Sequence, residues 1–491
     1  MSDAAVAGRR LHPASILVRL VKDLPSTALG IPAAFAFLSD AGWGNVVLVA
    51  LAVAAVTLAV NWLLWRRFRY GIDARGIVIE SGLLNRTRRS IPFERIQDVD
   101  IERGPLHRLL SLAKVRIETG GSASDEGLLD SVSLTEADRL RDAIRAGRAG
   151  EAHAAADAIP MPREEVRVVY AIGLRSLLLS GLFNFSFLYL AGLFAVLQAF
   201  EAWLPFDIYD PGRWIGLVEA RTAGTLSAGA ILFLLLVALL LGVGTGIIRT
   251  VSRDFGFRLL AEPERFRRER GLLTRSEVVL AKSRVQLALR KTGPLRRALG
   301  WYELVFQTLS AGKQGAGHQS VAPFARDEEV AAILGESDGL RAPEPAALAM
   351  VSSGYVWRKL VANILLPVLA IGVAAIFWLP ALGFLLLLPL FAAKPFIERR
   401  FHRYALVDGL LFVQRGLWRQ KLWMVPAANA QTVSISRSWL QRKLGTATLL
   451  IDTAGASNLS DPRIVDLKLD RAQALARALT AYSGKKSGTD K

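Results

Sequence analysis

The chain contains no cysteine among its 491 residues. Disulfide bonds, thiol chemistry and zinc sites with cysteine ligands are therefore excluded. Histidine is also scarce, and the five copies share no spacing typical of a metal site: His12, His107, His153, His318 and His402. The sequence lacks the glycine-rich phosphate-binding motif, and no Ser/His/Asp or paired-carboxylate arrangement recurs. These absences predict a protein that is not an enzyme, with no catalytic, cofactor-binding or metal-binding residues.

Charged side chains are missing from several long apolar stretches. Apolar residues make up 52% of the chain, the mean hydropathy is +0.33 and the net charge is +18. Such a charge suits nucleic acid, an anionic lipid surface or the cytoplasmic loops of a membrane protein. The basic residues gather at the ends of the apolar stretches, which favours the membrane protein and argues against nucleic acid. The first apolar stretch follows about two dozen residues of mixed polarity, so no cleavable signal peptide is expected.

Six transmembrane helices in three hairpins are expected, because a helical crossing needs about 20 apolar residues. The first four crossings are residues 25–43, 45–65, 176–200 and 226–248. The uncharged block Val361–Ala393 has 33 residues, which is too long for one crossing, and Pro380 and Gly383 lie near its centre. Lys359 precedes the block and Lys394 follows it, so both of its ends are expected in the cytoplasm. The block is therefore interpreted as the third hairpin.

One stretch of sequence occurs three times without a gap, as Gly82–Leu110, Gly271–Leu299 and Gly416–Leu444. Each copy starts with a glycine, has a glutamine fifteen positions later and closes with a Leu-x-Arg-x-Leu run. The glutamines are Gln97, Gln286 and Gln431, and the arginines of the closing run are Arg108, Arg297 and Arg442. Spacing of this kind predicts a repeated structural unit. The closing run is compatible with either an extended segment or a helical turn.

The repeated residues allow structural and functional interpretations. The glycines are expected to supply positive φ in hairpin turns. The glutamines are either shared ligand contacts or buried amides that bond the backbone at a strand end or bulge. The arginines of the closing run either bind lipid phosphates near the bilayer or are simply solvated.

The expected organisation is one unit used three times, in which a transmembrane hairpin precedes a small cytoplasmic α+β module. The boundaries are 1–65 for the lead-in and first hairpin, 66–148 for module 1, 171–249 for the second hairpin, 250–336 for module 2, 355–398 for the third hairpin, 399–482 for module 3, and 483–491 for a disordered tail. Each module is expected to end in a helix. Spacings of three or four residues place these pairs on the buried faces: Leu140 and Ile144, Val330 and Ile333, Leu475 and Leu479.

Module 2 has the largest excess of basic residues. Between Arg253 and Gly300 it has 13 basic and 5 acidic residues, a net charge of +8. This charge predicts contact with an anionic lipid surface. The first candidates are Arg265, Arg267, Arg268 and Arg270, the second are Arg296 and Arg297, and Arg108 and Arg442 are candidates in the other modules. The alternative is that these arginines are solvated or paired with acidic residues.

Several of these residues resemble a known family. The opening Leu11-His12-Pro13-Ala14-Ser15, the Arg-Phe-Arg-Tyr run at 67–70 and the glycine-to-glutamine repeat are similar to the YdbS/YdbT-like bacterial membrane proteins. Those proteins carry bacterial pleckstrin-homology (PH) domains of the second type. Module 1 matches best, whereas module 2 has Leu280-Ala281 in place of Ile91-Pro92 and module 3 has Asn429 in place of an arginine. The resemblance implies a partly open β-barrel with a C-terminal helix in each module.

The expected fold class is thus a multi-pass α-helical membrane protein with three α+β PH-like modules, in the bacterial inner membrane. Two functions remain open. The first is a non-enzymatic scaffold whose modules contact proteins or anionic lipid, with envelope or antimicrobial-stress protection as a role. The second is a component of a lipid or small-solute transporter, for which Asn184 and Ser186 are the main polar residues within a span. Expected partners are membrane lipids, other membrane proteins, a paired two-module family member, or further copies of the chain.

Overall fold

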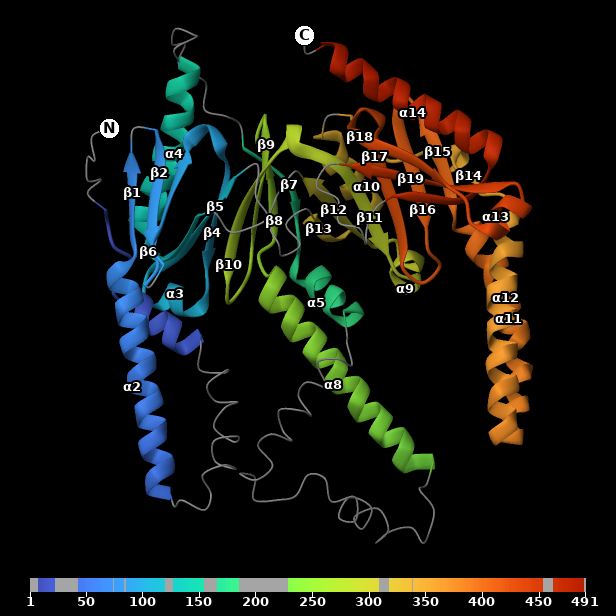
Figure 1. Ribbon diagram of the computed structural model, residues 1–491, viewed down its shortest axis with the longest axis horizontal. Helices are drawn as coiled ribbons and strands as arrows, with labels where there is room; N and C mark the ends of the chain where they lie inside the picture. Colours follow the sequence, from blue (N-terminus) through green and yellow to red (C-terminus); the bar gives the residue numbers. More distant parts are fainter. Residues whose placement is uncertain are drawn as a thin grey trace.

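The computed structural model describes residues 8–22, 43–73, 75–83, 85–119, 127–153, 166–184, 228–308, 318–337, 339–453 and 462–489. Within these ranges three sheet-rich modules lie in a row, and long apolar helices leave the row on one side (Figure 1). The helix α14 (Leu469–Thr489) lies along the opposite side. All of these apolar helices therefore extend from the same side of the row of modules.

Three helical segments of the described residues are long and apolar enough to cross a membrane: Val47–Arg67, Gly354–Phe377 and Leu379–Arg400. The first belongs to α2 (Trp43–Arg67), the second is α11 (Gly354–Phe377), and the third joins η6 (Leu379–Leu387) to α12 (Leu388–Arg400). Two further apolar helices are α5 (Leu174–Phe183) and α8 (Ala228–Asp254). The expected multi-pass class with six crossings is not shown, because residues 25–42 and 185–200 lie outside the described residues.

The third apolar block folds back on itself. Helix α11 packs against α12, and Asn363 Nδ2 donates a hydrogen bond to the Phe391 carbonyl oxygen at 3.3 Å. The chain reverses at Trp378, which has extended backbone angles, so the turn comes just before the expected Pro380. Proline at this point lacks an N–H and suits the first turn of the helix that follows.

Module 1 consists of two antiparallel three-stranded sheets and a helix. The first sheet holds β1 (Arg69–Asp73), β2 (Gly76–Ser81) and β3 (Thr87–Pro92); β4 (Ile96–Arg103), β5 (Leu112–Thr119) and β6 (Gly127–Ser133) follow, with α4 (Leu134–His153) after them. Alternating side chains such as Ile77, Ile117 and Leu140 are fully buried between the two sheets and the helix. This core is formed by residues of module 1 and of the lead-in alone.

Modules 2 and 3 repeat this plan with one extra strand each. Module 2 holds β7 (Arg167–Ala171), β8 (Arg258–Ala261), β9 (Arg265–Arg270), β10 (Arg275–Ala281), β11 (Val285–Thr292), β12 (Tyr302–Thr308), β13 (His318–Ala325) and α10 (Asp327–Gly335). Module 3 holds β14 (Ala349–Met350), β15 (Arg403–Val407), β16 (Leu410–Arg415), β17 (Gln420–Pro426), β18 (Ala430–Ser436), β19 (Thr446–Thr453), β20 (Arg463–Lys468) and α14.

The extra strands correct the expected boundaries. Strand β7 precedes the second hairpin and pairs with β8 after it, and β14 likewise pairs with β15 across the third hairpin. Each of these hairpins is therefore an insertion between the first two strands of its module, which begins before residue 250 or 399. The expected disordered tail is also wrong at its start, because α14 continues to Thr489.

The sheets continue from one module to the next. Two seven-stranded sheets have the orders β6-β5-β4-β10-β9-β8-β7 and β13-β12-β11-β17-β16-β15-β14. Strand β4 of module 1 thus pairs with β10 of module 2, and β11 of module 2 pairs with β17 of module 3. Leu287 and Leu289 of module 2 are buried in the core of module 3, so the modules are fused through both backbone and side chains.

The expected helix faces are confirmed. Leu140 and Ile144 of α4, and Val330 and Ile333 of α10, are at most 3% exposed. In α14, Leu479 is fully buried and Leu475 is partly buried against the same core. The helix completes the apolar core of each module.

The repeated glycines also behave as expected. Gly82, Gly271 and Gly416 have φ of +111°, +111° and +103°. A Cβ at each would lie 1.8–2.2 Å from a backbone oxygen three residues later, so only glycine fits.

All three repeated glutamines lie at β-bulges, between Ile96 and Asp98, Val285 and Leu287, and Ala430 and Thr432. Gln286 is 8% exposed and donates to the Arg284 carbonyl oxygen, as the buried-amide interpretation requires. Gln431 is exposed, so that interpretation is wrong for the third copy. The Gln97 side chain lies outside the described residues.

Candidate membrane-proximal surface

Two short elements of each module lie on the side from which the apolar helices leave. The first is the turn that each repeated glycine begins; its described residues are 82, 83 and 85 in module 1, 271–274 in module 2 and 416–419 in module 3. The second is a five-residue helix: α3 (Pro105–Leu109), α9 (Pro294–Ala298) and α13 (Trp439–Lys443). We call these turns and helices the membrane-proximal surface. The Leu-x-Arg-x-Leu run is therefore a helical turn, which settles the alternative that the sequence left open.

The turn in module 2 is fixed to the end of its apolar helix. The Gly271 and Leu272 N–H groups donate to the Phe255 and Ser252 carbonyl oxygens at 2.9 and 3.1 Å. These carbonyls belong to the last turn of α8 and the residue after it. Helix α9 lies on the same side of the row as α8, and α13 packs beside the start of α11 (Figure 1).

Large apolar side chains project from this surface into solvent. The most exposed are Leu109 (82%), Trp418 (70%), Leu295 (69%), Trp439 (64%), Leu299 (58%) and Leu273 (53%). Contiguous exposed apolar patches mark sites of contact with protein or membrane. Leucine or tryptophan on one face with arginine or lysine on the other is typical of helices that lie in the membrane–water interface.

The arginine of each closing run contacts the neighbouring module. Arg108 on α3 donates to the Leu272 carbonyl oxygen in the turn of module 2. Arg297 on α9 donates to Gln420 Oε1 of module 3 at 3.2 Å, and its guanidinium lies 4.4 Å from the centre of the Phe401 ring. Arg442 on α13 is exposed. Lipid contact stays a prediction for these arginines, since two of them already bind protein.

The residue before each of these arginines ties the short helix to other parts of the same module. His107 lies 3.1 Å from Asp130 Oδ1, and Arg296 donates to Asn184 Oδ1 of α5 at 2.8 Å. Gln441 donates to the buried Asp466 at 2.7 Å. Burial lowers the pKa of Arg296. Burial raises the pKa of Asp130, but the hydrogen bond and charge of His107 outweigh it, so that the Asp130 pKa is lowered. The Asp466 carboxylate accepts a further hydrogen bond from Arg358 of α11. In modules 2 and 3 the short helix is thus linked to the base of an inserted hairpin.

Sequence reasoning missed this second contact because the residue type changes from histidine to arginine to glutamine. Only the position, immediately before the repeated arginine, is shared. The contact with Asn184 also gives a structural role to one of the two main polar residues within the expected spans. Its amide nitrogen donates to Thr250 Oγ1 of α8 at 3.2 Å, so Asn184 joins α5, α8 and α9.

Two of the first-choice arginines of module 2 bind one buried acid. Arg265 Nε and Arg267 Nη2 each lie 3.1 Å from a carboxylate oxygen of Glu262, which is 5% exposed. Arg267 also approaches Glu277 at 3.7 Å. These contacts agree with the alternative interpretation, in which the arginines pair with acids.

The other two first-choice arginines are buried more deeply. Arg268 is 3% exposed and donates to the Ser320 carbonyl oxygen at 3.0 Å, and burial lowers its pKa to about 9. Arg270 lies 3.2 Å from the fully buried Asp254, and burial lowers the Arg270 pKa as well. The structure therefore places Arg268 in the interior of the module, away from any lipid surface.

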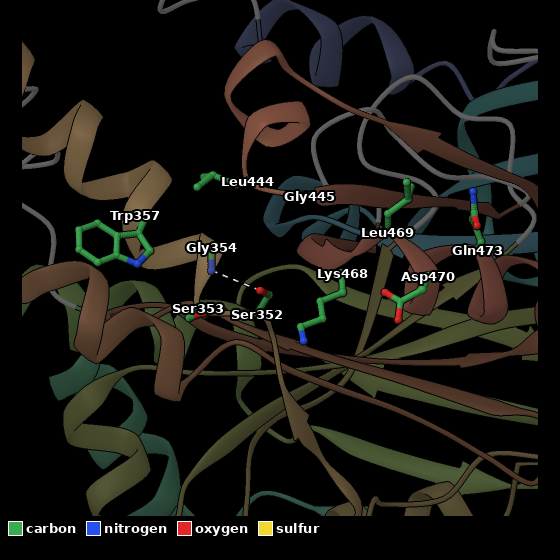
Figure 2. A pocket seen from close by; sticks show the side chains of 10 residues that line it. All are labelled: Ser352, Ser353, Gly354, Trp357, Leu444, Gly445, Lys468, Leu469, Asp470 and Gln473. Atoms are coloured by element: carbon green, nitrogen blue, oxygen red, sulfur yellow. Dashed lines mark hydrogen bonds between the residues drawn. The ribbon is translucent and has the colours of Figure 1, made fainter.

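A cleft of about 580 Å³ lies where α11, the α13–β19 corner and the start of α14 meet. It is lined by Ser352, Ser353, Gly354, Trp357, Leu444, Gly445, Lys468, Leu469, Asp470 and Gln473. Figure 2 shows Trp357 on one side, with Asp470 and Gln473 on the other. In this cleft the Ser352 hydroxyl accepts a hydrogen bond from the Gly354 N–H at 3.2 Å. Within the described ranges, no group of three or more His, Asp or Glu residues is placed to hold a metal ion.

Comparison with known proteins gives the same division into three. The sequence pattern of the bacterial PH domain family matches residues 23–148, 213–340 and 361–483. The UPF0699 transmembrane protein YdbT of Bacillus subtilis is 25% identical over 324 residues, which is 63% of this chain and 63% of YdbT. The UPF0699 transmembrane protein YdbS of the same organism is 38% identical over 77 residues, 16% of this chain and 46% of YdbS. The chain is homologous to both and spans less than two thirds of either.

Proposed function

Because the chain belongs to the bacterial PH domain family, we propose that it is a non-enzymatic membrane scaffold which holds three fused PH-like modules in a row on the cytoplasmic face of the bacterial inner membrane. The membrane-proximal surface is the part of each module that enters the lipid interface. The observation that carries this proposal is the set of exposed leucines and tryptophans on the side from which the apolar helices leave.

The distribution of charge supports this orientation. Helices α2 and α12 end in basic pairs, Arg66 with Arg67 and Arg399 with Arg400, and α8 has Arg253 in its last turn. Basic residues at the ends of spans favour the cytoplasmic side. Six crossings in three hairpins would place both ends of every hairpin, and all three modules, on that side.

The energies involved favour partial insertion over simple adsorption. Complete removal of a leucine side chain from water contributes about 1.5–3 kcal/mol. A basic residue near anionic lipid adds about 1 kcal/mol, screened beyond about 8–10 Å at physiological salt. The Lys443 ammonium lies 5.2 Å from the centre of the Trp439 ring, so α13 combines both contributions in one turn.

The transporter alternative depends on six helices that form a path, and it stays open. Of the two polar residues noted within the expected spans, Asn184 is bonded to Arg296 and Thr250. Ser186 lies outside the described residues.

The absence of native cysteine allows a direct test of the proposed lipid contact. Full-length Leu273→Cys and Trp418→Cys variants are labelled with an environment-sensitive fluorophore and reconstituted in vesicles that contain a quencher at the headgroup level. A Thr480→Cys variant, exposed on α14 at the opposite side of the row, is the matched control. We expect strong quenching at the first two sites and little at the third. Equal quenching at all three sites would show that the modules do not rest on the bilayer through this surface.

A further inference from the structure

Strand pairing between modules follows the same register at both internal joints. Ser276 of β10 pairs with Glu102 of β4 at the first joint, and Lys421 of β17 pairs with Lys291 of β11 at the second. Ser276 and Lys421 are each the fifth residue after the repeated glycine, whereas Glu102 and Lys291 are each the twentieth. The paired side chains differ between the two joints, but the register is the same. The strand pairing between modules is therefore set by the repeated unit and not by particular side chains.

Modules 1 and 3 each have one further strand that is the counterpart of a strand used at the internal joints. Strand β3 is the counterpart of β10 and β17, and β18 is the counterpart of β4 and β11; each is the last strand of a three-stranded sheet. Across the described ranges, no strand pairs with the outer edge of either. Side chains Thr87 to Ser90 of β3 and Ser434 to Ser436 of β18 are exposed. Leu289, which occupies the position of Ser434 in the second joint, is fully buried.

The repeated arginine points to the same missing contact. Arg108 and Arg297 each bind the next module at or just after its glycine turn. Arg442 occupies the equivalent position on α13 and is exposed. A module placed beyond β18 would supply the partner that this side chain has in the two earlier copies.

We propose that copies of this chain assemble end to end in the membrane, with β18 of one copy pairing antiparallel with β3 of the next in the register of the internal joints. Thr87 then lies opposite Ser436, and Arg88 lies opposite Ile435. The apolar helices all leave one side of the row, so addition at either end keeps every copy upright in the same bilayer (Figure 1). The joint is heterologous, and it closes into a ring or extends as a row.

The side chains at this joint have precedents inside the chain. Arg88 opposite Ile435 occupies the same pair of positions as Leu422 opposite Arg290 at the second joint, with the arginine and the aliphatic residue exchanged between the strands. Arg86 opposite Arg437 repeats the pairing of Arg275 with Arg103 at the first. An exposed strand edge pairs readily with another strand through backbone hydrogen bonds.

Helix α14 restricts the part of β18 that can pair with β3 of a second copy to the C-terminal half of the strand. The helix packs over η7 (Ala427–Asn429) and β18, and still leaves Ser434 to Ser436 exposed. The paired residues of β4 at the first joint are Ile101 to Arg103, the counterparts of Ile435 to Arg437. A second copy fits because it offers a β3 edge that is itself the counterpart of the strands already used at both internal joints.

Cysteine crosslinking tests the register in native membranes. Two differently tagged full-length chains, one with Thr87→Cys and one with Ser436→Cys, are produced together in a host without relatives of this protein. Mild oxidation should give a disulfide-linked product of twice the monomer mass, because directly opposite residues have Cβ atoms about 4.5–5.5 Å apart. The matched control pairs Thr87→Cys with Ser434→Cys, which is two residues out of register on the same face, and should crosslink several-fold less.

A charge pair tests the same contact without a disulfide. Ile435 is 37% exposed, so both Ile435→Lys and Ile435→Glu should fold. Opposite Arg88, the lysine should reduce crosslinking several-fold and the glutamate should preserve it, because like charges directly opposite each other are destabilising. Combining Ile435→Lys with Arg88→Glu should restore the wild-type yield.

Three results would overturn the proposal: no linked product in membranes, equal yields from the two cysteine pairs, or a product from Thr87→Cys chains alone. The last would indicate a symmetric contact of β3 with itself. This proposal rests on the proposed function in one respect: all copies must be embedded in one membrane in the same orientation. Crosslinking reports contact between modules whereas the quenching experiment reports contact with lipid, so either can fail without the other.

Discussion

His402 lies just after the third hairpin and is 1% exposed. Its ring packs edge-on against Tyr355, with 5.5 Å between the ring centres. Burial lowers its pKa from 6.5 to about 3, and the charges of Arg415 and Arg358 act in the same direction. The imidazole is therefore neutral in the folded protein at pH 7.

This burial makes stability depend on pH. In the unfolded chain the His402 pKa is about 6.5. Below that pH the unfolded state binds one more proton than the folded state, so the free energy of unfolding falls as pH falls. The loss is about 1.4 kcal/mol per pH unit and continues until the folded pKa of about 3 is reached. At pH 5 it amounts to about 2 kcal/mol.

We predict that His402→Phe removes this part of the pH dependence while keeping the aromatic contact. Thermal unfolding of the full chain in nanodiscs at pH 7 and pH 5 measures it. The wild type should lose more stability on acidification than the variant does. The control His12→Gln changes an exposed histidine and should behave like the wild type. Equal losses in the wild type and His402→Phe would mean that His402 is protonated in the folded state.

Individual residues were predictable from sequence only where backbone geometry dictates the residue type. The glycines belong to this class, because a positive φ beside a close carbonyl admits no side chain. Arg268 does not belong to this class. Its sequence neighbours are mostly basic, and nothing in them indicates that the Arg268 side chain is buried and bonded to the Ser320 carbonyl oxygen. Gln286 and Gln431 share a motif position but differ in burial: Gln286 is 8% exposed and its carbonyl oxygen accepts a hydrogen bond from Asn429 of module 3, whereas Gln431 is exposed.

At the scale of secondary structure, the terminal helix of each module is a structural requirement. Ile144 of α4 is 3% exposed and belongs to the core of module 1, whereas Ala146 on the same helix is exposed. The two positions differ in burial and hardly at all in sequence context.

We predict that Ile144→Asp destabilises the full chain by several kcal/mol, because it buries a charge without a partner. Ala146→Asp introduces the same residue at the exposed position and should change stability by no more than about 0.5 kcal/mol. Limited proteolysis of module 1 in membranes, followed over temperature, compares the two. Similar sensitivity of both variants would show that α4 does not pack as described.

Elements were easier to predict than their partners. The terminal helices follow from spacing, since apolar residues three or four positions apart share a helix face. The pairing of β10 with β4 does not follow, because Arg275 to Glu277 show no preference for one distant strand over another. The insertion of the hairpins within modules was missed for the same reason: β14 is two residues long, too short to give a pattern.

At the scale of the whole molecule, the modules differ in how far they depend on one another. The core of module 1 contains no residue from module 2 or module 3. The core of module 3 includes Leu287, Leu289 and Val305 of module 2.

We predict that a chain ending at residue 340 is poorly stable, because removal of module 3 exposes Leu287 and Leu289 along the edge of β11. A chain that begins at residue 166 loses the short β4–β10 pairing and the contacts that Arg108 and Arg141 make with module 2, but no residue of the apolar core that modules 2 and 3 share, and it should remain folded. Yield and size-exclusion behaviour after mild detergent extraction measure both. A well-behaved 1–340 chain would mean that the shared core of modules 2 and 3 contributes little.

The fused sheets also imply an order in which the modules fold and pair during synthesis. Strand β4 is complete long before the ribosome has made β10, and β11 likewise precedes β17 by a whole membrane hairpin. Because domains fold from the N-terminus as they emerge, each of the first two modules folds with one unpaired strand edge. The next module then pairs with that edge. The nascent chain thus serves as its own template at both internal joints, and within the described residues the outer edge of β18 offers the same kind of template with no strand paired to it.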